Sequence, residues 1–332
     1  MSRVAVISGV GGYVPPGVTT NDDLARRLDT SDEWIRTRTG IRERRFVEPG
    51  TATIELAVEA GARALKSAGE TEVDLVVLAT MTPDRICPAS APEIASRLGL
   101  GGVAAFDVSA VCTGFVYALA ASAGMIGAGI ADRALCIGAE AISRYLNPSD
   151  RNTAVIFGDG AGALVLRAGE RGEAGAVGPF DLGSDGEHGD LIAVPAGGSR
   201  RPIASDRTAD DVYLVMDGRE VYRHAIPRMV ASSLAVLERA GWDPGDVDRF
   251  VGHQANARIL DAVADRLGIA ADRRVSNIGR VGNTAAASIP LALADAAADG
   301  TLQHGHRVLL TAFGGGLTWG SAILTWPEVP AD

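Results

Sequence analysis

The sequence predicts an α/β fold in which one alternating unit occurs twice. Residues 65–78 have the pattern of a helix end, an acidic turn and a buried strand, and residues 237–252 repeat that order. Predicted strands at 133–137 and 307–311 recur at a similar spacing. Because 332 residues are many for a single hydrophobic core, the repetition predicts two halves with parallel-rich, mixed sheets and helices on their faces.

The elements of the first half follow from apolar periodicity and turn residues. Strands are expected at 3–8, 73–80, 103–109 and 133–138. Helices are expected at 21–28 and 51–68, and a third helix follows the break at 83–88 and ends at about residue 98. The glycine-rich residues 9–17 indicate a turn-rich connection. Glycines at 158–162 have the look of a dinucleotide-binding motif, but they precede a strand and do not open a helix. Close backbone packing is therefore the expected reason for them.

A segment rich in Gly, Asp and Arg, residues 169–210, is expected to connect the halves, which we place at 1–170 and 171–332. In a duplicated fold, equivalent helix starts meet near the centre. The helix start at Cys112 is therefore expected to lie close to its counterpart near Asn283.

Cys112 is the first candidate for catalysis. It follows a predicted strand and precedes an uncharged helix, so it lies where helix N–H groups are unpaired and a partial positive charge lowers the pKa of a thiol. The alternative is a small buried apolar side chain, because free cysteine is among the most buried residue types.

Composition and charge restrict the function. A formal net charge of −10 argues against general nucleic-acid binding, while clustered arginines suit an acidic partner. Three cysteines, Cys87, Cys112 and Cys136, lack metal-ligand spacing and indicate a reducing, cytosolic setting. The histidines show no metal spacing either, so no metal site is expected. The N-terminal sequence predicts no export signal.

One uncharged segment, residues 108–131, has the length of a membrane span. Small residues dominate it, no lysine or arginine collar flanks it, and it includes the end of a strand. We expect a helix buried in the protein and no membrane association.

An arginine-rich segment surrounds Trp34, at residues 29–45. A single aromatic ring among guanidinium groups suits a ligand that carries adenine and phosphate. The alternative is a solvated loop with Trp34 as its anchor.

Two further motifs offer polar groups for catalysis. His253 follows a predicted strand, and Asn283 precedes a predicted helix. With Cys112 they supply an imidazole, a carboxamide and a thiol. His253 also fits a hydrogen-bonded core histidine, and Asn283 also fits a helix cap.

Motifs along nearly the whole chain resemble those of the β-ketoacyl-acyl-carrier-protein synthase III family, which are condensing enzymes of the thiolase fold. The matching segments are 29–44, 107–115, 150–151, 157–162, 253–256, 282–284 and 313–320. The resemblance implies a layered α/β/α/β/α architecture and a homodimer.

The resemblance also implies a two-step reaction. Cys112 would take an acyl group from an acyl-CoA, with the N–H groups of Cys112 and Gly315 holding the oxyanion. Malonyl-acyl-carrier protein would then lose carbon dioxide beside Phe313, and His253 and Asn283 would donate to the enolate oxygen. No permanently bound cofactor and no metal is implied.

Other positions match the family in substrate binding. Trp34 and Arg151 match the residues that sandwich the adenine of CoA, Arg38 matches a phosphate contact, and Gly218 and Asn256 match positions near the pantetheine arm.

Two basic residues, Arg223 and Arg258, match positions that dock the acidic carrier protein. Asp265-Arg266 stands where a basic pair is often found, which is a departure from the family pattern.

The resemblance implies an acyl pocket that differs from that of the acetyl-preferring members of the family. Cys87 stands where those enzymes have an aromatic side chain that reaches across the subunit interface. A longer or wider pocket is expected, unless Ile142 or Leu317 fills the space.

Three alternatives remain for the function. A related acyltransferase would pass the acyl group to a hydroxyl or amine, a cysteine hydrolase would use Cys, His and Asn in the same order, and an interaction protein would form no acyl adduct. His253 and Asn283 together favour condensation, since enolate stabilisation needs both.

Overall fold

Strands from the first half form one mixed sheet. The computed structural model describes residues 3–202 and 208–330. The first sheet has the strand order β1 (Arg3–Tyr13), β7 (Gly160–Glu170), β6 (Arg133–Glu140), β4 (Leu75–Ala79) and β5 (Ala104–Val108). The pairs β1–β7 and β7–β6 are antiparallel, and β6–β4 and β4–β5 are parallel.

Strands from the second half repeat this arrangement. The second sheet has the order β8 (Val177–Ser184), β13 (Thr318–Thr325), β12 (Arg307–Gly314) and β11 (Arg249–Gly252). Its pairs are again antiparallel, antiparallel and parallel. In place of a fifth strand, Arg274 makes a single parallel bridge to Phe250. The matching order confirms the duplicated α/β fold. The last strand of the first sheet ends at Glu170, and the first strand of the second sheet begins at Val177. That residues 170 and 171 mark a boundary between domains stays a prediction.

Two helices lie between the sheets. They are α5 (Gly114–Gly127) and α9 (Ser288–Ala298). Their apolar side chains join those of both sheets in one buried cluster that includes Phe115, Leu119, Ile289 and Leu293. Residues 108–131 thus form a strand end and a buried helix, as expected.

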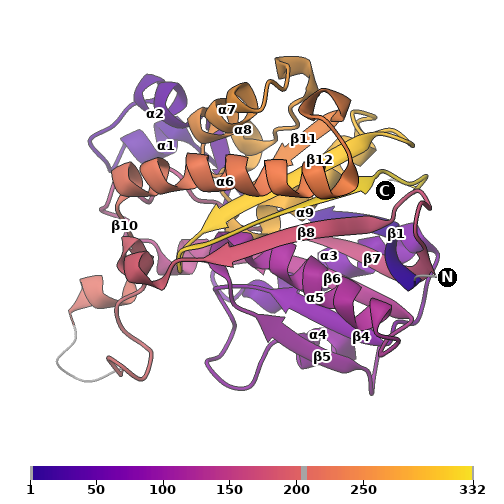
Figure 1. Cartoon of the computed structure of the whole chain (residues 1–332). Helices are drawn as coiled ribbons and strands as arrows, with labels where there is room; N and C mark the ends of the chain where they lie inside the picture. Colours follow the sequence, from indigo (N-terminus) through magenta and orange to yellow (C-terminus); the bar gives the residue numbers. More distant parts are fainter. Residues whose placement is uncertain (1–2, 203–207, 331–332) are drawn as a thin grey trace.

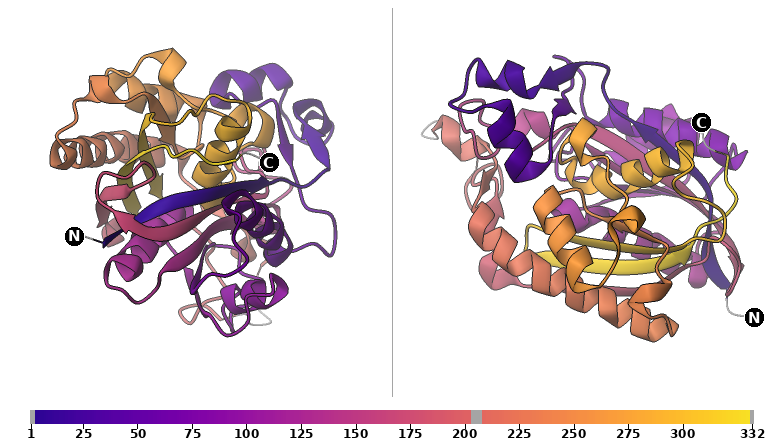
Figure 2. Two further views of the ribbon diagram at one scale, coloured as in Figure 1. Left: turned by 90° about the vertical axis from the view of Figure 1, so that its right-hand side faces the viewer. Right: turned by 90° about the horizontal axis from the view of Figure 1, so that it is seen from above.

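Further helices cover the outer faces (Figures 1 and 2). Helices α3 (Thr53–Ala68) and α4 (Ala91–Arg97) pack on the first sheet, and α6 (Gly218–Ala240) and α7 (Ala257–Arg266) pack on the second. The result is the five-layer α/β/α/β/α architecture that was predicted.

Short elements complete the described chain. The two-stranded pairs are β2 (Val18–Thr20) with β3 (Glu43–Arg45), and β9 (Ile192–Ala193) with β10 (Val215–Met216). The short helices are α1 (Asn21–Ala25), α2 (Asp32–Thr39) and α8 (Ile278–Val281). The 3-10 turns are η1 (Val111–Thr113), η2 (Ile142–Tyr145), η3 (Gly186–Leu191), η4 (Ala209–Val212), η5 (Pro244–Asp246), η6 (Ala271–Arg273) and η7 (Ala285–Ala287).

The predicted turn at 9–17 is wrong for its first part, because strand β1 continues to Tyr13. Its glycines serve packing instead of turning. A Cβ on Gly9 would lie 2.4 Å from the carbonyl oxygen of Ala64, and one on Gly11 would lie 2.4 Å from the amide nitrogen of the same residue. Helix α3 therefore approaches the strand at backbone distance.

The connecting segment also differs from expectation. Residues 169–210 include β8, a full member of the second sheet, and β9, which pairs with β10. Residues 203–207 of this segment lie outside the described residues.

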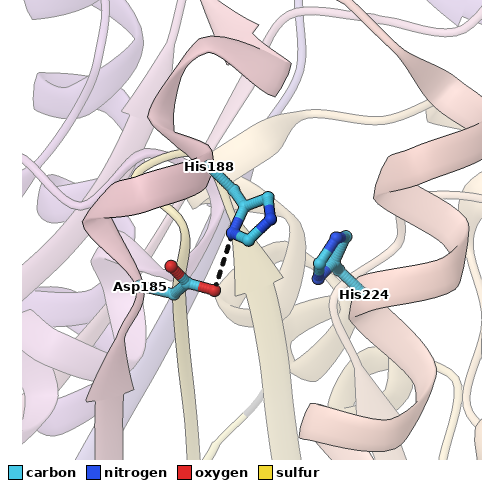
Figure 3. Close-up of side chains that lie close together, drawn as sticks. All are labelled: Asp185, His188 and His224. Carbon is cyan, nitrogen blue, oxygen red and sulfur yellow. Dashed lines mark hydrogen bonds and ion pairs between the residues drawn. The ribbon is translucent and has the colours of Figure 1, made fainter.

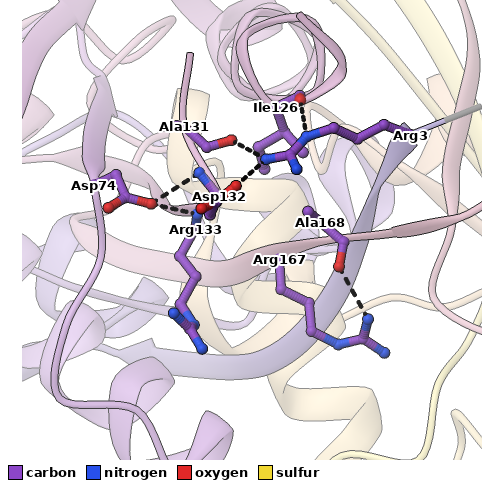
Figure 4. Close-up of polar contacts among 8 residues, drawn as sticks. All are labelled: Arg3, Asp74, Ile126, Ala131, Asp132, Arg133, Arg167 and Ala168. Carbon is purple, nitrogen blue, oxygen red and sulfur yellow. Dashed lines mark hydrogen bonds and ion pairs between the residues drawn. The ribbon is translucent and has the colours of Figure 1, made fainter. Parts of the chain in front are cut away.

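Strand β1 is tied to the far end of α5, away from Cys112. The guanidinium of Arg3 donates to the carbonyls of Ile126 and Ala131, at 2.6 and 2.8 Å, and pairs with Asp132 (Figure 4). A cation here complements the partial negative charge at the C-terminus of the helix. Nearby, Asp74 accepts from the N–H groups that begin β6, each at 2.8 Å. Within the described residues, no helix has both the length and the apolarity to span a bilayer.

Candidate active site

Cys112 lies in the 3-10 turn η1, directly between strand β5 and helix α5. The preceding residue, Val111, has φ of 48°, a left-handed conformation that is strained for a β-branched residue. The repeated half has the same feature, since Ala285 begins η7 with φ of 46°. The two helix starts pack against each other: Gly114 at the start of α5 would place a Cβ 3.5 Å from the Cβ of Ala286.

The three candidate catalytic side chains reach one cavity. Cys112, His253 and Asn283 all line a partly open cavity of about 110 Å³. His253 follows strand β11, and Asn283 precedes η7 and α9. Each is at least nine-tenths buried. The structure therefore brings together residues that the sequence separates widely.

The rest of this cavity is largely apolar. Its other lining residues include Met81, Val111, Ile156, Phe157, Ile192, Leu214, Met216, Val221, Ala225, Met229, Ile259 and Phe313. Such walls suit an acyl chain and exclude water from the reacting groups.

Burial and a nearby carboxyl group raise the pKa of Cys112 to about 12. The sequence had predicted a lowered value from the helix start. The difference arises mainly because the thiol is desolvated, which disfavours a thiolate. Above about pH 8, where Glu140 ionises, its negative charge disfavours the thiolate further. Cys112 is therefore a neutral thiol in the resting site.

His253 is also neutral. Burial lowers the pKa of its imidazole to about 3. Its Nδ1 lies 2.6 Å from Oγ of Ser288, and its backbone N–H donates to the carbonyl of Thr311. Ser288 thus holds one ring nitrogen, and Thr311 holds the backbone of the same residue.

Asn283 has a defined amide orientation. Its Oδ1 accepts the N–H of Ala285 at 2.9 Å, which leaves Nδ2 as the group available to a ligand. Its backbone is held on both sides, by the carbonyl of Ile156 and the N–H of Gly158. Asn283 therefore both caps a turn and offers a donor to the cavity.

The end of β12 and the glycine that follows it lie against the turn that carries Cys112. A Cβ on Gly314 would be 2.8 Å from the backbone nitrogen of Cys112, so only glycine fits there. Gly315 approaches the side chains of Val111 and Ile192. Phe313, from the same segment, lines the cavity. The positions of Gly315 and Phe313 are compatible with their predicted roles, which stay predictions.

A second, open groove of about 650 Å³ lies next to the cavity. Trp34 and Arg38 line it, and the groove and the cavity share Ile156, Met216, Gly218 and Asn256 as lining residues. The arginine-rich segment therefore lies beside a groove that adjoins the cavity of Cys112.

The guanidinium groups of Arg38 and Arg151 lie 4.5 and 5.2 Å from the ring of Trp34. These are direct cation–π contacts. An adenine could enter between Trp34 and Arg151 only if the two side chains moved apart.

Comparisons with known proteins identify the family. Residues 237–326 match the family described as 3-oxoacyl-[acyl-carrier-protein] synthase III C terminal, and residues 106–186 match 3-oxoacyl-[acyl-carrier-protein] synthase III. Over 332 residues the chain is 58% identical to β-ketoacyl-[acyl-carrier-protein] synthase III 5 of Streptomyces coelicolor, with 100% of each covered. The chain belongs to the 3-oxoacyl-[acyl-carrier-protein] synthase III family.

Solved structures agree with this assignment. The synthase III from Pseudomonas aeruginosa PAO1 is 50% identical with a TM-score of 0.93, covering 98% of this chain and 99% of the other. A priming β-ketosynthase of the R1128 polyketide pathway is 35% identical with a TM-score of 0.91, covering 99% and 98%. The resemblance seen in the sequence is confirmed, and so is the fold.

The residues predicted for the acyl pocket lie outside the cavity of the single chain, and their role stays a prediction. Within the described chain, none of Cys87, Ile142 and Leu317 lines the cavity. Cys87 is exposed, Ile142 packs in the same buried cluster as Cys112, and Leu317 packs beneath helices α6 and α7. The part that was assigned to Cys87 depends on a second subunit.

The two arginines expected to dock a carrier protein are exposed. Arg223 pairs with its neighbour Glu220, and Arg258 donates to the carbonyl of Thr37. Asp265, which departs from the family pattern, pairs with Arg274 at 2.6 Å.

Three potential metal ligands gather outside the active site. Donor atoms of Asp185, His188 and His224 lie within 4.8 Å of one another (Figure 3). Arg228 already donates to Asp185 at 2.6 Å, and its Nη1 lies 2.8 Å from Nδ1 of His224. A guanidinium in this place repels a cation, so we interpret the cluster as a polar connection between η3 and α6.

Sequence reasoning missed two polar neighbours of the site. Ser288 contacts His253, and Glu140 bonds to Thr80, Thr82 and the N–H of Met81. The sequence could have drawn attention to Glu140, because it places a carboxyl group at the end of an apolar strand. Nothing in the sequence distinguished Ser288 from other helical serines.

Proposed function

We propose that this synthase III condenses an acyl-CoA primer with malonyl-acyl-carrier protein through an acyl group carried on Cys112. The observation that supports this most is that Cys112, His253 and Asn283 line one apolar cavity, which shares four lining residues with the groove beside Trp34. We further infer that the enzyme works as a homodimer in the cytoplasm, where its cysteines stay reduced.

In the loading step, the sulfur of Cys112 bonds to the acyl carbon and the carbon–sulfur bond to CoA breaks. The thiol proton is transferred to the departing CoA. Because the first N–H groups of a helix have no intrahelical partner, the N–H of Cys112 is available to the oxyanion, and that of Gly315 would be the second donor.

In the condensation step, malonyl-carrier protein loses carbon dioxide and its electron pair passes into an enolate. His253 and Asn283 donate to the enolate oxygen, and the enolate carbon attacks the acyl carbon. The bond to Cys112 sulfur breaks, and the sulfur takes up a proton. The products are a β-ketoacyl-carrier protein, carbon dioxide and free enzyme.

Cavity and groove also support the proposed binding of CoA. The arginines beside Trp34 would bind the adenine and phosphates, and the walls near Gly218 and Asn256 would enclose the pantetheine arm. Arg223 and Arg258 would bind the acidic carrier protein at the groove. No resident cofactor or metal is needed for either step.

Acyl transfer to Cys112 is tested by intact-mass measurement after exposure to a series of acyl-CoAs. One acyl mass should be added, and it should map to the peptide that contains Cys112. The Cys112→Ala variant should take up no acyl group. An adduct on Cys87 or Cys136, or one that persists in the variant, would refute the assignment.

A further inference from the structure

We propose that Ser288 is a positioning residue that holds His253 in the tautomer with its proton on Nε2. The inference about the tautomer stands on the resting structure alone. Its consequence for the reaction rests on the proposed condensation.

The contact is short and shielded from water. Oγ of Ser288 lies 2.6 Å from Nδ1 of His253, and the two residues are 1% and 2% exposed. Ser288 is the first residue of α9, and His253 directly follows β11. Two elements of the second half thus meet at this hydrogen bond.

Hydrogen-bond accounting decides which atom donates. The hydroxyl of Ser288 also accepts the N–H of Gln254, at 3.4 Å. Among the described residues, Oγ makes no hydrogen bond other than these two. If Nδ1 of His253 donated, the serine proton would be a buried donor without an acceptor, which is costly. If the serine donates, all of these groups are satisfied.

The charge state agrees with this direction. A protonated imidazole would carry hydrogens on both nitrogens and could not accept from Ser288. Burial disfavours that charged form, and His253 has no carboxylate partner within the described chain. A neutral ring that accepts at Nδ1 must carry its proton on Nε2.

The tautomer determines what the cavity offers to a substrate. With a proton on Nε2, His253 donates to an enolate oxygen beside Nδ2 of Asn283. With the proton on Nδ1, the Nε2 lone pair would face that oxygen and repel it. Ser288 therefore converts a neutral histidine into an oxyanion donor without adding charge.

The direct test is ¹⁵N NMR of the resting protein with ¹⁵N-labelled histidine. His253 is assigned by the loss of its signals in His253→Gln. The expected wild-type result is a protonated Nε2 and an unprotonated Nδ1. In Ser288→Ala a proton should appear on Nδ1 in a measurable fraction of molecules. A wild-type Nδ1–H, or an unchanged tautomer in Ser288→Ala, overturns the proposal.

Kinetics separate positioning from a structural role. Ser288→Ala should load an acyl group within about twofold of wild type and condense roughly 10- to 100-fold more slowly, less than the roughly 100- to 1000-fold loss for a deleted donor. Ser288→Thr, which restores a hydroxyl, should recover the tautomer and most of the rate. Equal losses in both steps, or condensation unaffected by a shifted tautomer, contradict the proposal.

Ser233→Ala is the matched control. Its hydroxyl is buried and has no hydrogen-bond partner among the described residues, so its removal should leave tautomer and rates unchanged. If wild type shows the Nε2 proton but makes no β-keto product from any acyl-CoA, the proposed function fails and the tautomer assignment stands.

Discussion

At the scale of the residue, the active-site groups are neutral until the reaction creates charge. Burial raises the pKa of Cys112 to about 12 and lowers that of His253 to about 3. Over the range between these values the resting cavity holds a thiol, a neutral imidazole and an amide. Donors aimed at a transient enolate then stabilise the transition state more than the ground state.

Asn283 should serve condensation more than loading, because its Nδ2 is the free end of a fixed amide. Asn283→Ala should still be acylated on Cys112, while formation of β-keto product falls about 100- to 1000-fold. Both steps can be followed by mass spectrometry on the same preparation. Loss of acylation with intact malonyl decarboxylation would contradict this division of roles.

Glu140 should make stability depend on pH. Burial raises the pKa of this carboxyl group to about 8 from an ordinary 4.5. Between these values the folded chain binds one proton more than the unfolded chain, so this contribution to the free energy of unfolding falls as pH rises. Glu140→Gln keeps the shape of the side chain and removes the titration.

The measurement is urea unfolding of wild type and Glu140→Gln from about pH 5 to about pH 7.5. The wild type should lose about 1.4 kcal/mol per pH unit relative to the variant. The contribution of His253 has the opposite sign, fades as pH falls below 6.5, and cancels because both proteins contain it. A pH-independent difference would show that Glu140 is not protonated in the fold.

The sequence indicated Cys112, His253 and Asn283 because each stands at the end of a recognisable element. It could not indicate Ser288 or the raised pKa of Cys112. Both depend on which side chains the duplicated halves bring together, and that information lies in tertiary contacts.

At the scale of the element, glycines in the strands let the backbone of a neighbouring layer pack directly against the backbone of the strand. A Cβ on Gly162 of β7 would lie 2.4 Å from the amide nitrogen of Leu291 in α9, and a Cβ on Gly138 of β6 would lie 2.4 Å from the carbonyl oxygen of Ala286. Most strands could be predicted because an apolar run is a local feature of the sequence. The extension of β1 to Tyr13 could not be predicted, because its glycines resemble those of a turn and their packing against α3 is a tertiary contact.

Gly162→Ala should destabilise the fold by at least about 2 kcal/mol. The added methyl group would clash with the backbone of α9, which cannot move aside as a flexible side chain can. Gly124→Ala is the matched control. Gly124 lies within helix α5 with nothing near its Cβ position, so alanine should stabilise by about 0.5 to 1 kcal/mol. Urea midpoints of both variants test this, and equal effects would contradict the close approach.

At the scale of the whole molecule, duplication explains why the site lies at the centre. Each half supplies one helix start, and the two starts meet between the sheets with Cys112 on one side and Asn283 on the other. The repeated motifs were enough to predict this meeting. One wall of the cavity was not predictable, because Leu214, Met216 and Gly218 come from a stretch without apolar periodicity between η4 and the start of α6.

An exposed apolar side chain marks where the proposed second subunit would matter. Ile86 is 82% exposed and Cys87 is exposed beside it, which is unusual for two adjacent apolar residues. In the proposed homodimer this segment would approach the partner's cavity. A small thiol there leaves more room for a primer than the aromatic side chain of acetyl-preferring relatives.

We therefore expect branched or medium-length acyl-CoAs to be loaded at least as well as acetyl-CoA, since each buried methylene contributes about 0.8 kcal/mol. Cys87→Phe should return the preference toward acetyl by clashing with longer chains, and Cys87→Ser, of nearly equal size, should not. The measurement is the ratio of acylation kcat/KM for hexanoyl-CoA over acetyl-CoA in all three proteins. Strict selectivity of the wild type for acetyl, or one ratio shared by Cys87→Phe and Cys87→Ser, would remove Cys87 from the determinants of primer length.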